Sequence, residues 1–260
     1  MGRVKSTAAK EIPMTAAPLY GKTVVVTGAY GGIGRALVTE LLGQGARVVA
    51  ADIAADVPWS NAPDGENLLS HYVDIGDWRS CDDLARATYD RFGAVDALVN
   101  NAGIDAPPGL AWEITEEHWD RLISVNLSGA WRCTRSFLDA MRKQGHGRIV
   151  MISSITARHG STRYSPAYAA AKAGLIGLTS GLSAQLEGNG ILVNAITPGA
   201  TGSTGTPMTP EEEAALARDF PLGAGGPQPV VDAVTYLLGP SGGWISGAVL
   251  NVTGGQLRGI

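Results

Sequence analysis

The chain contains few of the residues that build metal sites and disulfide frameworks. Its 260 residues include two cysteines, Cys81 and Cys133, and four scattered histidines. None of them has the spacing of a metal-ligand motif, so we expect no bound metal. The cysteines lie far apart in the sequence and form no disulfide framework, which fits the reducing environment of the cytoplasm. The sequence therefore predicts a cytoplasmic protein that binds no metal.

Long runs of apolar residues and long runs of basic residues are also missing. No stretch approaches the ~20 apolar residues of a membrane span, and residues 1–19 lack the apolar segment of a secretory signal. There is no long Lys/Arg run and the formal net charge is −4, so a role in binding nucleic acid or an anionic membrane gets no support. We expect a flexible arm over residues 1–19 and one domain over residues 20–260.

Short apolar runs recur along the chain and alternate with segments of helical spacing. Strands are predicted at 23–27, 47–51, 68–73, 96–100, 148–152, 191–196 and 248–252. Helices are predicted at 78–92 behind an N-cap at Asp77, at about 116–143, and from Pro166 onward. The alternation implies right-handed parallel βαβ units. We therefore predict a single-domain, doubly wound, parallel seven-stranded sheet with helices on both faces.

Tyr168 and Lys172 stand four residues apart on a predicted helix, shortly after Ser153 and Ser154. Positions i and i+4 share one face of a helix, so the phenol and the ammonium can meet. A nearby ammonium favours the phenolate and lowers its pKa from ~10. Such a tyrosine could exchange a proton with a substrate oxygen, which a serine hydroxyl could hold in place. Taken alone, the pair is equally compatible with a solvated surface turn.

A glycine-rich segment, Thr-Gly-Ala-Tyr-Gly-Gly-Ile-Gly at 27–34, joins the first predicted strand to the first helix. Glycines there permit a tight turn and close approach of the backbone to a pyrophosphate, and the helix N-terminus adds free N–H groups. A turn needed only for packing is the alternative. The segment predicts a dinucleotide site whose members are Gly28, Tyr30, Gly31, Gly32, Ile33 and Gly34.

Asp52 follows the second predicted strand, 24 residues after Gly28. A carboxylate there can accept hydrogen bonds from a ribose diol and would repel a 2′-phosphate. Its neighbours Ala51 and Ile53 offer no cation for such a phosphate. We therefore expect NAD rather than NADP, although an aspartate that merely forms a turn is the alternative.

Further polar and small residues follow the next strand ends. Asp74 and Ile75 could contact the adenine edge, and Asn101, Ala102 and Gly103 could let the backbone touch the adenosine. The alternative for either set is that the residues only form a turn. Because ligands of doubly wound folds bind beyond the carboxyl ends of the strands, their position supports a shared site.

These motifs, together with Asn126 and Pro198-Gly199, occur in the order seen in the classical short-chain dehydrogenase/reductase family, which residues 20–257 resemble. The resemblance implies a Rossmann-type fold and a catalytic tetrad in which Tyr168 is the acid/base. Lys172 would lower the pKa of Tyr168 and bind the nicotinamide ribose, and Ser154 would orient the substrate oxygen. Asn126 would hold a water that links Lys172 to solvent, unless it is a helix-interior residue with a local hydrogen bond. The resemblance also implies cofactor contacts from Tyr168, Lys172, Pro198, Gly199, Thr201 and Ser203.

The sequence departs from the family pattern at two places. The interval from Ser154 to Tyr168 is one residue longer than expected, which leaves Ser153 as a competing choice for the serine. Thr201 stands where an aliphatic residue is usual, and Ser203 stands where threonine is usual. These departures put the substrate pocket and the nicotinamide contacts in question.

The resemblance implies an NAD-dependent oxidoreductase acting on a secondary alcohol or ketone, and alcohol oxidation is the expected direction. Segments 155–165 and 200–222 would line its pocket, where Arg158, His159 and Arg163 could bind a carboxylate or polyol, although a solvated loop is favoured. A sugar, hydroxy acid or cyclic diol is favoured over a steroid. The family also implies a homotetramer, with its closing strand and interface near residues 244–255.

Two other functions compete with this one. A 3-oxoacyl-[acyl-carrier-protein] reductase would be expected to use NADP and to carry a basic docking patch, which Asp52 and the net acidity disfavour. A non-catalytic dinucleotide-binding module would be expected to lack part of the tetrad, and here all four residue types are present.

Overall fold

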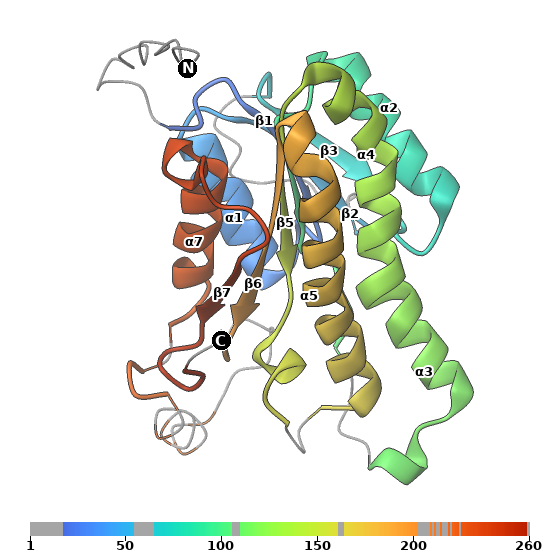
Figure 1. The fold of residues 1–260 in the computed structure, drawn as a ribbon, viewed down its shortest axis with the longest axis vertical. Coiled ribbons are helices and arrows are strands. Elements are labelled where there is room, and N and C mark those ends of the chain that lie inside the picture. The colour runs from blue at the N-terminus through green and yellow to red at the C-terminus, as the bar shows by residue number, and fades with distance from the viewer. Residues whose placement is uncertain are drawn as a thin grey trace, which may run out of the picture.

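The computed structural model describes residues 18–54, 65–105, 110–160, 164–201, 209, 211, 214, 218, 220–223 and 225–258. Seven strands form one sheet in the order β3-β2-β1-β4-β5-β6-β7, and every neighbouring pair is parallel (Figure 1). The strands are β1 (Thr23–Thr27), β2 (Arg47–Asp52), β3 (Leu68–Tyr72), β4 (Ala97–Asn100), β5 (Gly147–Ile152), β6 (Ile191–Pro198) and β7 (Val249–Val252). The predicted doubly wound sheet is confirmed.

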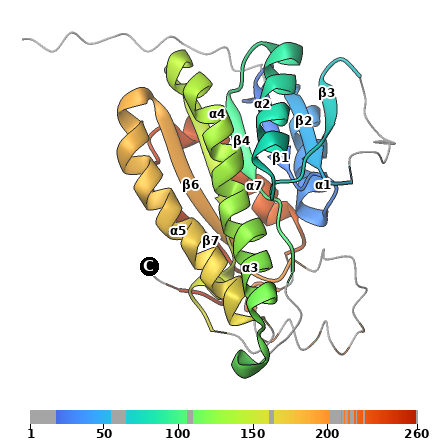
Figure 2. The same cartoon turned by 90° about the vertical axis from the view of Figure 1, so that its right-hand side faces the viewer.

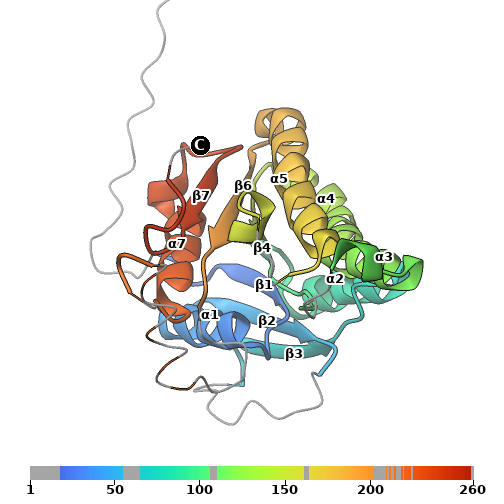
Figure 3. The same cartoon turned by 90° about the horizontal axis from the view of Figure 1, so that it is seen from below.

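Helices cover both faces of the sheet, as Figure 3 shows end-on. On one face lie α1 (Gly32–Gly43) and α7 (Gln228–Leu238), whose apolar side chains share a core with β1, β2 and β4. On the other lie α2 (Trp78–Phe92), α4 (Ala130–Gln144) and α5 (Pro166–Leu186). Each face therefore has its own apolar core, which explains why the central strands are almost continuously apolar.

The helix starts follow the capping residues read from the sequence. The Asp77 side chain accepts a hydrogen bond from the Arg79 N–H at the start of α2. Pro166 occupies the first position of α5, and the Ser165 hydroxyl accepts from the Ala167 N–H. Proline is favourable at the first position because its missing N–H would have no partner inside the helix. The short 3₁₀ turns are 111–113, 155–157, 187–189 and 240–242.

The helix predicted over residues 116–143 is not one regular element. It comprises α3 (Glu116–Ile123), a π-helical turn over Ser124–Gly129, and α4, which continues the same rod (Figure 2). A π-turn accommodates an extra residue without ending the helix, and sequence periodicity does not reveal it. The third strand also ends one residue earlier than predicted, and the sixth extends to Pro198 because β7 pairs with it.

The predicted arm over residues 1–19 is described only in its last two residues. Residues 1–17 of the predicted arm lie outside the described residues. Leu19, by contrast, is 2% exposed and packs in the core beside α1 and α7. Among the residues that the structure describes, no helix is long and apolar enough to cross a membrane.

Candidate active site

A cleft of about 810 Å³ opens where the strand order reverses, between β1 and β4. This switch point is where doubly wound sheets bind ligands, because the connections leave the sheet in opposite directions there. The cleft is lined by twelve of the predicted cofactor residues, namely Gly28, Tyr30, Gly31, Gly32, Ile33, Asp52, Asp74, Ile75, Asn101, Ala102, Gly103 and Thr201.

Two glycines of the glycine-rich segment, Gly28 and Gly34, have no room for a side chain. Gly28 has φ +65°, and a Cβ atom there would lie 2.7 Å from the Ala102 Cα. A Cβ atom on Gly34 would overlap the Gly28 carbonyl oxygen. The Asn101 side chain donates to the Thr27 and Gly28 carbonyl oxygens, both at 3.0 Å. Gly34 and Asn101 thus shape the loop that leads into α1, and the first N–H groups of a helix are the ones that can bind a pyrophosphate.

Two carboxylates at the cleft are hydrogen bonded to neighbouring backbone. Asp52 accepts from the Tyr30 N–H at 2.9 Å and from the Ala54 N–H at 3.0 Å. Asp74 accepts from the Gly76 N–H at 2.8 Å. Each carboxylate oxygen has two lone pairs, so turn formation and ligand binding are compatible at both positions.

The four members of the predicted tetrad lie close together next to Gly103, which lines the cleft. The Ser154 hydroxyl lies beside the Tyr168 phenol and lowers its pKa. The Lys172 Nζ lies 5.6 Å from the centre of the Tyr168 ring. A Cβ atom on Gly103 would lie 2.5 Å from Asn126 Oδ1 and 3.4 Å from Lys172 Nζ, so both groups converge on Gly103. Strand β5, the π-turn and α5 therefore bring the four residues to one place.

Asn126 lies within the π-turn and is 1% exposed. Its amide donates to the Ile104 carbonyl oxygen and accepts from the Ile104 N–H, both at 3.0 Å. The hydrogen bonds of Asn126 are therefore not local to its helix, because Ile104 lies 22 residues away. They fix the segment after β4 against the helix that carries Asn126.

The two candidate serines have different environments. Ser153 is buried, and its hydroxyl donates to the Lys172 carbonyl oxygen at 2.7 Å. The Ser154 oxygen accepts from the Thr156 N–H at 3.2 Å and lies 2.9 Å from the Thr156 hydroxyl oxygen. Consecutive residues of an extended segment point to opposite sides. Ser154 is therefore the serine beside Tyr168, and Ser153 ties β5 to α5.

Burial determines the protonation of the two central groups. It raises the pKa of Tyr168 above its usual value, with smaller contributions from Asp105 and Tyr164, whereas the hydrogen bond with Ser154 lowers it. Burial also lowers the pKa of Lys172 to about 8, against an opposing effect of Asp105. The lowered Tyr168 pKa expected from the sequence is not found. The ammonium lies over the ring and donates to the Ile152 carbonyl oxygen at 3.0 Å, so desolvation of the phenolate dominates.

We expect the buried Lys172 to make stability depend on pH. Its pKa is lower in the folded protein than its ordinary 10.5, so the unfolded chain binds more protons between about pH 8 and 10.5, and stability rises with pH in that window. The gain should amount to about 3 kcal/mol. Denaturant unfolding of wild type and Lys172→Met at pH 7, 8, 9 and 10 measures it. Parallel pH profiles of the two proteins would contradict the expectation.

Several predicted cofactor residues do not line the cleft. These are Gly34, Tyr168, Lys172, Pro198 and Gly199, whereas Ser203 lies outside the described residues. Gly199 packs closely, since a Cβ atom there would lie 2.7 Å from the Phe220 ring. Among the proposed substrate residues, Arg158 donates to Asn251 at 3.1 Å, and Arg163 lies outside the described part of the chain.

The structure adds residues that sequence reasoning missed. Asp105 and Arg121 bring opposite charges to the cleft, beside Ile104 and Val125. Tyr164 stacks on Tyr168 with ring centres 5.3 Å apart. Tyr164 precedes Ser165, the N-cap of α5, so helical spacing does not account for this contact, and the sequence carried no signal for it. No group of three or more potential metal ligands occurs among the described residues.

Comparisons with known proteins show which family the chain is similar to. A family model described as short chain dehydrogenase matches residues 22–216. Similar curated proteins include the 3-oxoacyl-[acyl-carrier-protein] reductase FabG of Thermotoga maritima, 35% identical over 244 residues, which cover 91% of this chain and 98% of that protein. The protein of the same name from Escherichia coli is 35% identical over 245 residues, with 91% and 97% covered. The (2S)-[(R)-hydroxy(phenyl)methyl]succinyl-CoA dehydrogenase subunit BbsD of Thauera aromatica is 33% identical over 244 residues, with 92% and 97% covered.

Proposed function

Because the chain belongs to the short-chain dehydrogenase family, we propose that it is an NAD-dependent enzyme that interconverts a secondary alcohol and a ketone. As an oxidoreductase of this family it binds a nicotinamide dinucleotide. The segment from Gly28 to Ile33 fits such a group, because it lines the cleft and leads into the N-terminus of α1. We further propose that the enzyme works in the cytoplasm.

The observation that carries the proposal is the contact between Ser154 and Tyr168 with Lys172 beneath the ring. The nicotinamide supplies a hydride acceptor or donor when bound. Ser154 would hold the substrate oxygen, and Tyr168 would take its proton during oxidation and return it during reduction. Lys172, with a pKa of about 8, would be largely protonated at neutral pH and would favour the phenolate that forms. Asn126 would complete the proton path from Lys172.

Turnover assays test the reaction class. Purified protein should change NADH absorbance with at least one member of a panel of sugars, hydroxy acids, cyclic diols and the corresponding ketones. A protein that binds NADH without turning over any member would instead support a non-catalytic dinucleotide-binding module.

We expect the two serines to separate activity from stability. Ser154→Ala should lower kcat by about 10²-fold, because the substrate oxygen and the Tyr168 phenol both lose a hydrogen-bond partner. Ser153→Ala should keep most of the turnover but lower the unfolding free energy by about 1 kcal/mol, because the bond to the Lys172 carbonyl is lost. Steady-state kinetics and urea unfolding measure both effects. The opposite pattern would make Ser153 the residue at the substrate.

Asp52 supports the choice of NAD. Its carboxylate lines the cleft and is held by the Tyr30 and Ala54 N–H groups, so a 2′-phosphate there would meet a fixed negative charge. We expect Asp52→Asn to change the ratio of NADH to NADPH affinity by about tenfold or more in favour of NADPH. Fluorescence titrations measure this ratio, with the exposed-helix variant Asp83→Asn as control. An unchanged ratio would remove the argument for NAD.

A 3-oxoacyl reductase is the second candidate, and it is favoured by the names of two similar proteins. The discriminating experiment compares NADH and NADPH as donors with 3-oxoacyl thioesters and with free ketones. Efficient NADPH-dependent reduction of the thioesters alone would establish the second candidate.

We also propose a homotetramer. The segment before β7 carries Trp244, which is 99% exposed, and Leu250 of β7 is exposed as well. Because β7 is an edge strand of the sheet, it is available for contacts with another copy. Sizing chromatography with light scattering measures the mass, and Trp244→Lys tests this surface.

A further inference from the structure

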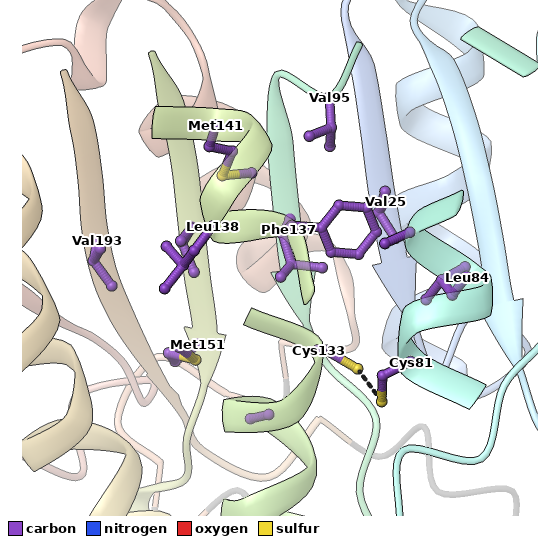
Figure 4. Close-up of a cluster of buried hydrophobic side chains, with 14 of the residues drawn as sticks. Val25, Cys81, Leu84, Val95, Cys133, Phe137, Leu138, Met141, Met151 and Val193 are labelled. Atoms are coloured by element: carbon purple, nitrogen blue, oxygen red, sulfur yellow. Dashed lines mark hydrogen bonds between the residues drawn. The ribbon is translucent and has the colours of Figure 1, made fainter. Parts of the chain in front are cut away.

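The two cysteines, which are 52 positions apart in the sequence, touch in the folded chain. The Sγ atoms of Cys81 and Cys133 lie 3.5 Å apart, and both residues are 0% exposed. Figure 4 shows them at the interface between α2 and α4, below Phe137 and beside Leu84. Both thiols are free. Because the two cysteines are far apart in the sequence, the sequence alone did not identify them as a pair of thiols in contact.

The surroundings make the two sulfurs unequal. The hydrogen bond with Cys133 lowers the pKa of Cys81, and burial opposes that effect. The charged groups that act on Cys81 are Arg132, Asp82 and Asp77. The pKa of Cys133 is raised by its hydrogen bond with Cys81 and by burial. Cys81 also lies in the first turn of α2, where the helix N-terminus favours a thiolate, so Cys81 is the better nucleophile and Cys133 the resolving thiol.

We propose that Cys81 and Cys133 are a modification site at which a peroxide forms an intramolecular disulfide, and that this disulfide weakens dinucleotide binding. The formation of the disulfide is argued from the short distance between the two sulfurs. The effect on dinucleotide binding rests on the cleft described for the proposed function. Hydrogen peroxide is little larger than water, so local opening of the α2–α4 interface would admit it.

The reaction balances with one peroxide. The Cys81 thiolate attacks one peroxide oxygen, an S–O bond forms, and the O–O bond breaks with release of hydroxide, which takes up the proton that the Cys81 thiol lost and becomes the first water. The Cys133 thiol then attacks the sulfenic sulfur, the S–S bond forms, and the S–O bond breaks. The oxygen leaves as a second water after taking the Cys133 proton. Two thiols are oxidised, and one peroxide is reduced to two waters.

The disulfide would affect the shape of the cleft through both α2 and α4. A disulfide needs an S–S distance of about 2.05 Å, so the sulfurs must approach from 3.5 Å. Cys81 lies in the first turn of α2, next to Ser80, whose hydroxyl oxygen accepts from the Asp74 N–H at 2.9 Å. Asp74 lines the cleft. A shift of the first turn of α2 would therefore move Asp74 and, with it, one wall of the cleft.

On the other helix, Cys133 follows Arg132. The Arg132 guanidinium donates to the Ile75 carbonyl oxygen at 3.3 Å and to the Ser124 carbonyl oxygen at 3.0 Å. Ile75 lines the cleft, and Ser124 begins the π-turn that holds Asn126. Drawing the helices together disturbs the segment at 74–75 from two sides. Weaker binding of the dinucleotide is the expected consequence.

The test uses the full chain and readouts that need no substrate. After treatment with hydrogen peroxide, denatured and alkylated wild type should retain no free thiol, and its intact mass should fall by about 2 Da. The Kd for NADH, or for NADPH if that binds better, should rise about fivefold. Dithiothreitol should restore both values in the same sample. Cys81→Ala and Cys133→Ala should show no peroxide-dependent change in Kd.

Three results would overturn the proposal. They are persistence of both thiols, oxidation to sulfinic acid instead of a disulfide, and a disulfide that leaves the Kd unchanged. Reversal by dithiothreitol keeps the test valid even where an alanine variant fails to fold. Because thiol content and Kd are measured without turnover, an absence of alcohol dehydrogenase activity would count against the proposed function and not against this modification.

Discussion

Replacing Tyr168 by phenylalanine should reduce kcat by about 10³-fold, within the 10²–10⁴-fold range of general acid–base catalysis. The substitution removes one oxygen from a largely buried ring and leaves the stacking on Tyr164 intact. It also removes the proton acceptor and the partner of Ser154. Because the ring remains above Lys172, dinucleotide affinity should change by less than about threefold.

Steady-state kinetics and NADH titration measure these two quantities on the same preparations. Tyr164→Phe is the matched control, since it removes a hydroxyl from the neighbouring ring and should keep kcat within about threefold. Turnover of Tyr168→Phe close to wild type would refute its role as acid/base. Equal losses in both variants would point to a general disturbance of the pocket instead.

Replacing Gly34 by alanine should remove dinucleotide binding and destabilise the fold by about 3 kcal/mol. The new methyl group would overlap the Gly28 carbonyl oxygen and lie 2.8 Å from the Ala29 Cα. These are backbone atoms, so the contact cannot be relieved by a change of rotamer. The first turn of α1 must move away from the loop, and the N–H groups offered to the pyrophosphate would move with it.

Gly43→Ala provides the control on the same helix. A Cβ atom at Gly43 meets nothing within 4 Å, and alanine is the better helix former, so stability should rise by up to about 1 kcal/mol. Urea unfolding and NADH titration measure both variants. Wild-type affinity of Gly34→Ala for NADH would mean that the glycine-rich segment does not contact the cofactor.

The positions of the strands along the chain, and their alternation with helices, were predictable because they depend on local chemistry. The apolar run Val24–Val26 is buried on both sides of the sheet, and such runs indicate parallel strands. Asp77 marks a helix start through its bond to the Arg79 N–H, and Pro166 marks one because its missing N–H needs no partner in the first turn. The glycine segment and Asp52 follow strand ends, and parallel strands place their carboxyl ends at the same edge of the sheet. Twelve of the 19 residues that line the cleft could thus be inferred without coordinates.

Contacts between distant segments were not predictable in the same way. The π-turn at Ser124–Gly129 is set by packing, and Asn126 bonds to Ile104 through it. Asp105 enters the site from the segment after β4, and nothing in the residues around Tyr168 indicates it. The contact between Cys81 and Cys133 exists because α2 packs on α4.

The sequence by itself determined the alternating fold, the glycine cradle and the types of residue available for proton transfer. The tertiary structure decided which of two adjacent serines lies beside Tyr168, and it decided the direction of two pKa shifts. Lys172 is 5% exposed, and burial lowers its pKa, whereas burial raises the pKa of Tyr168. Spacing along a helix determines which groups can meet. How much water remains around them depends on every segment that covers the site, and that quantity determines the cost of their charge.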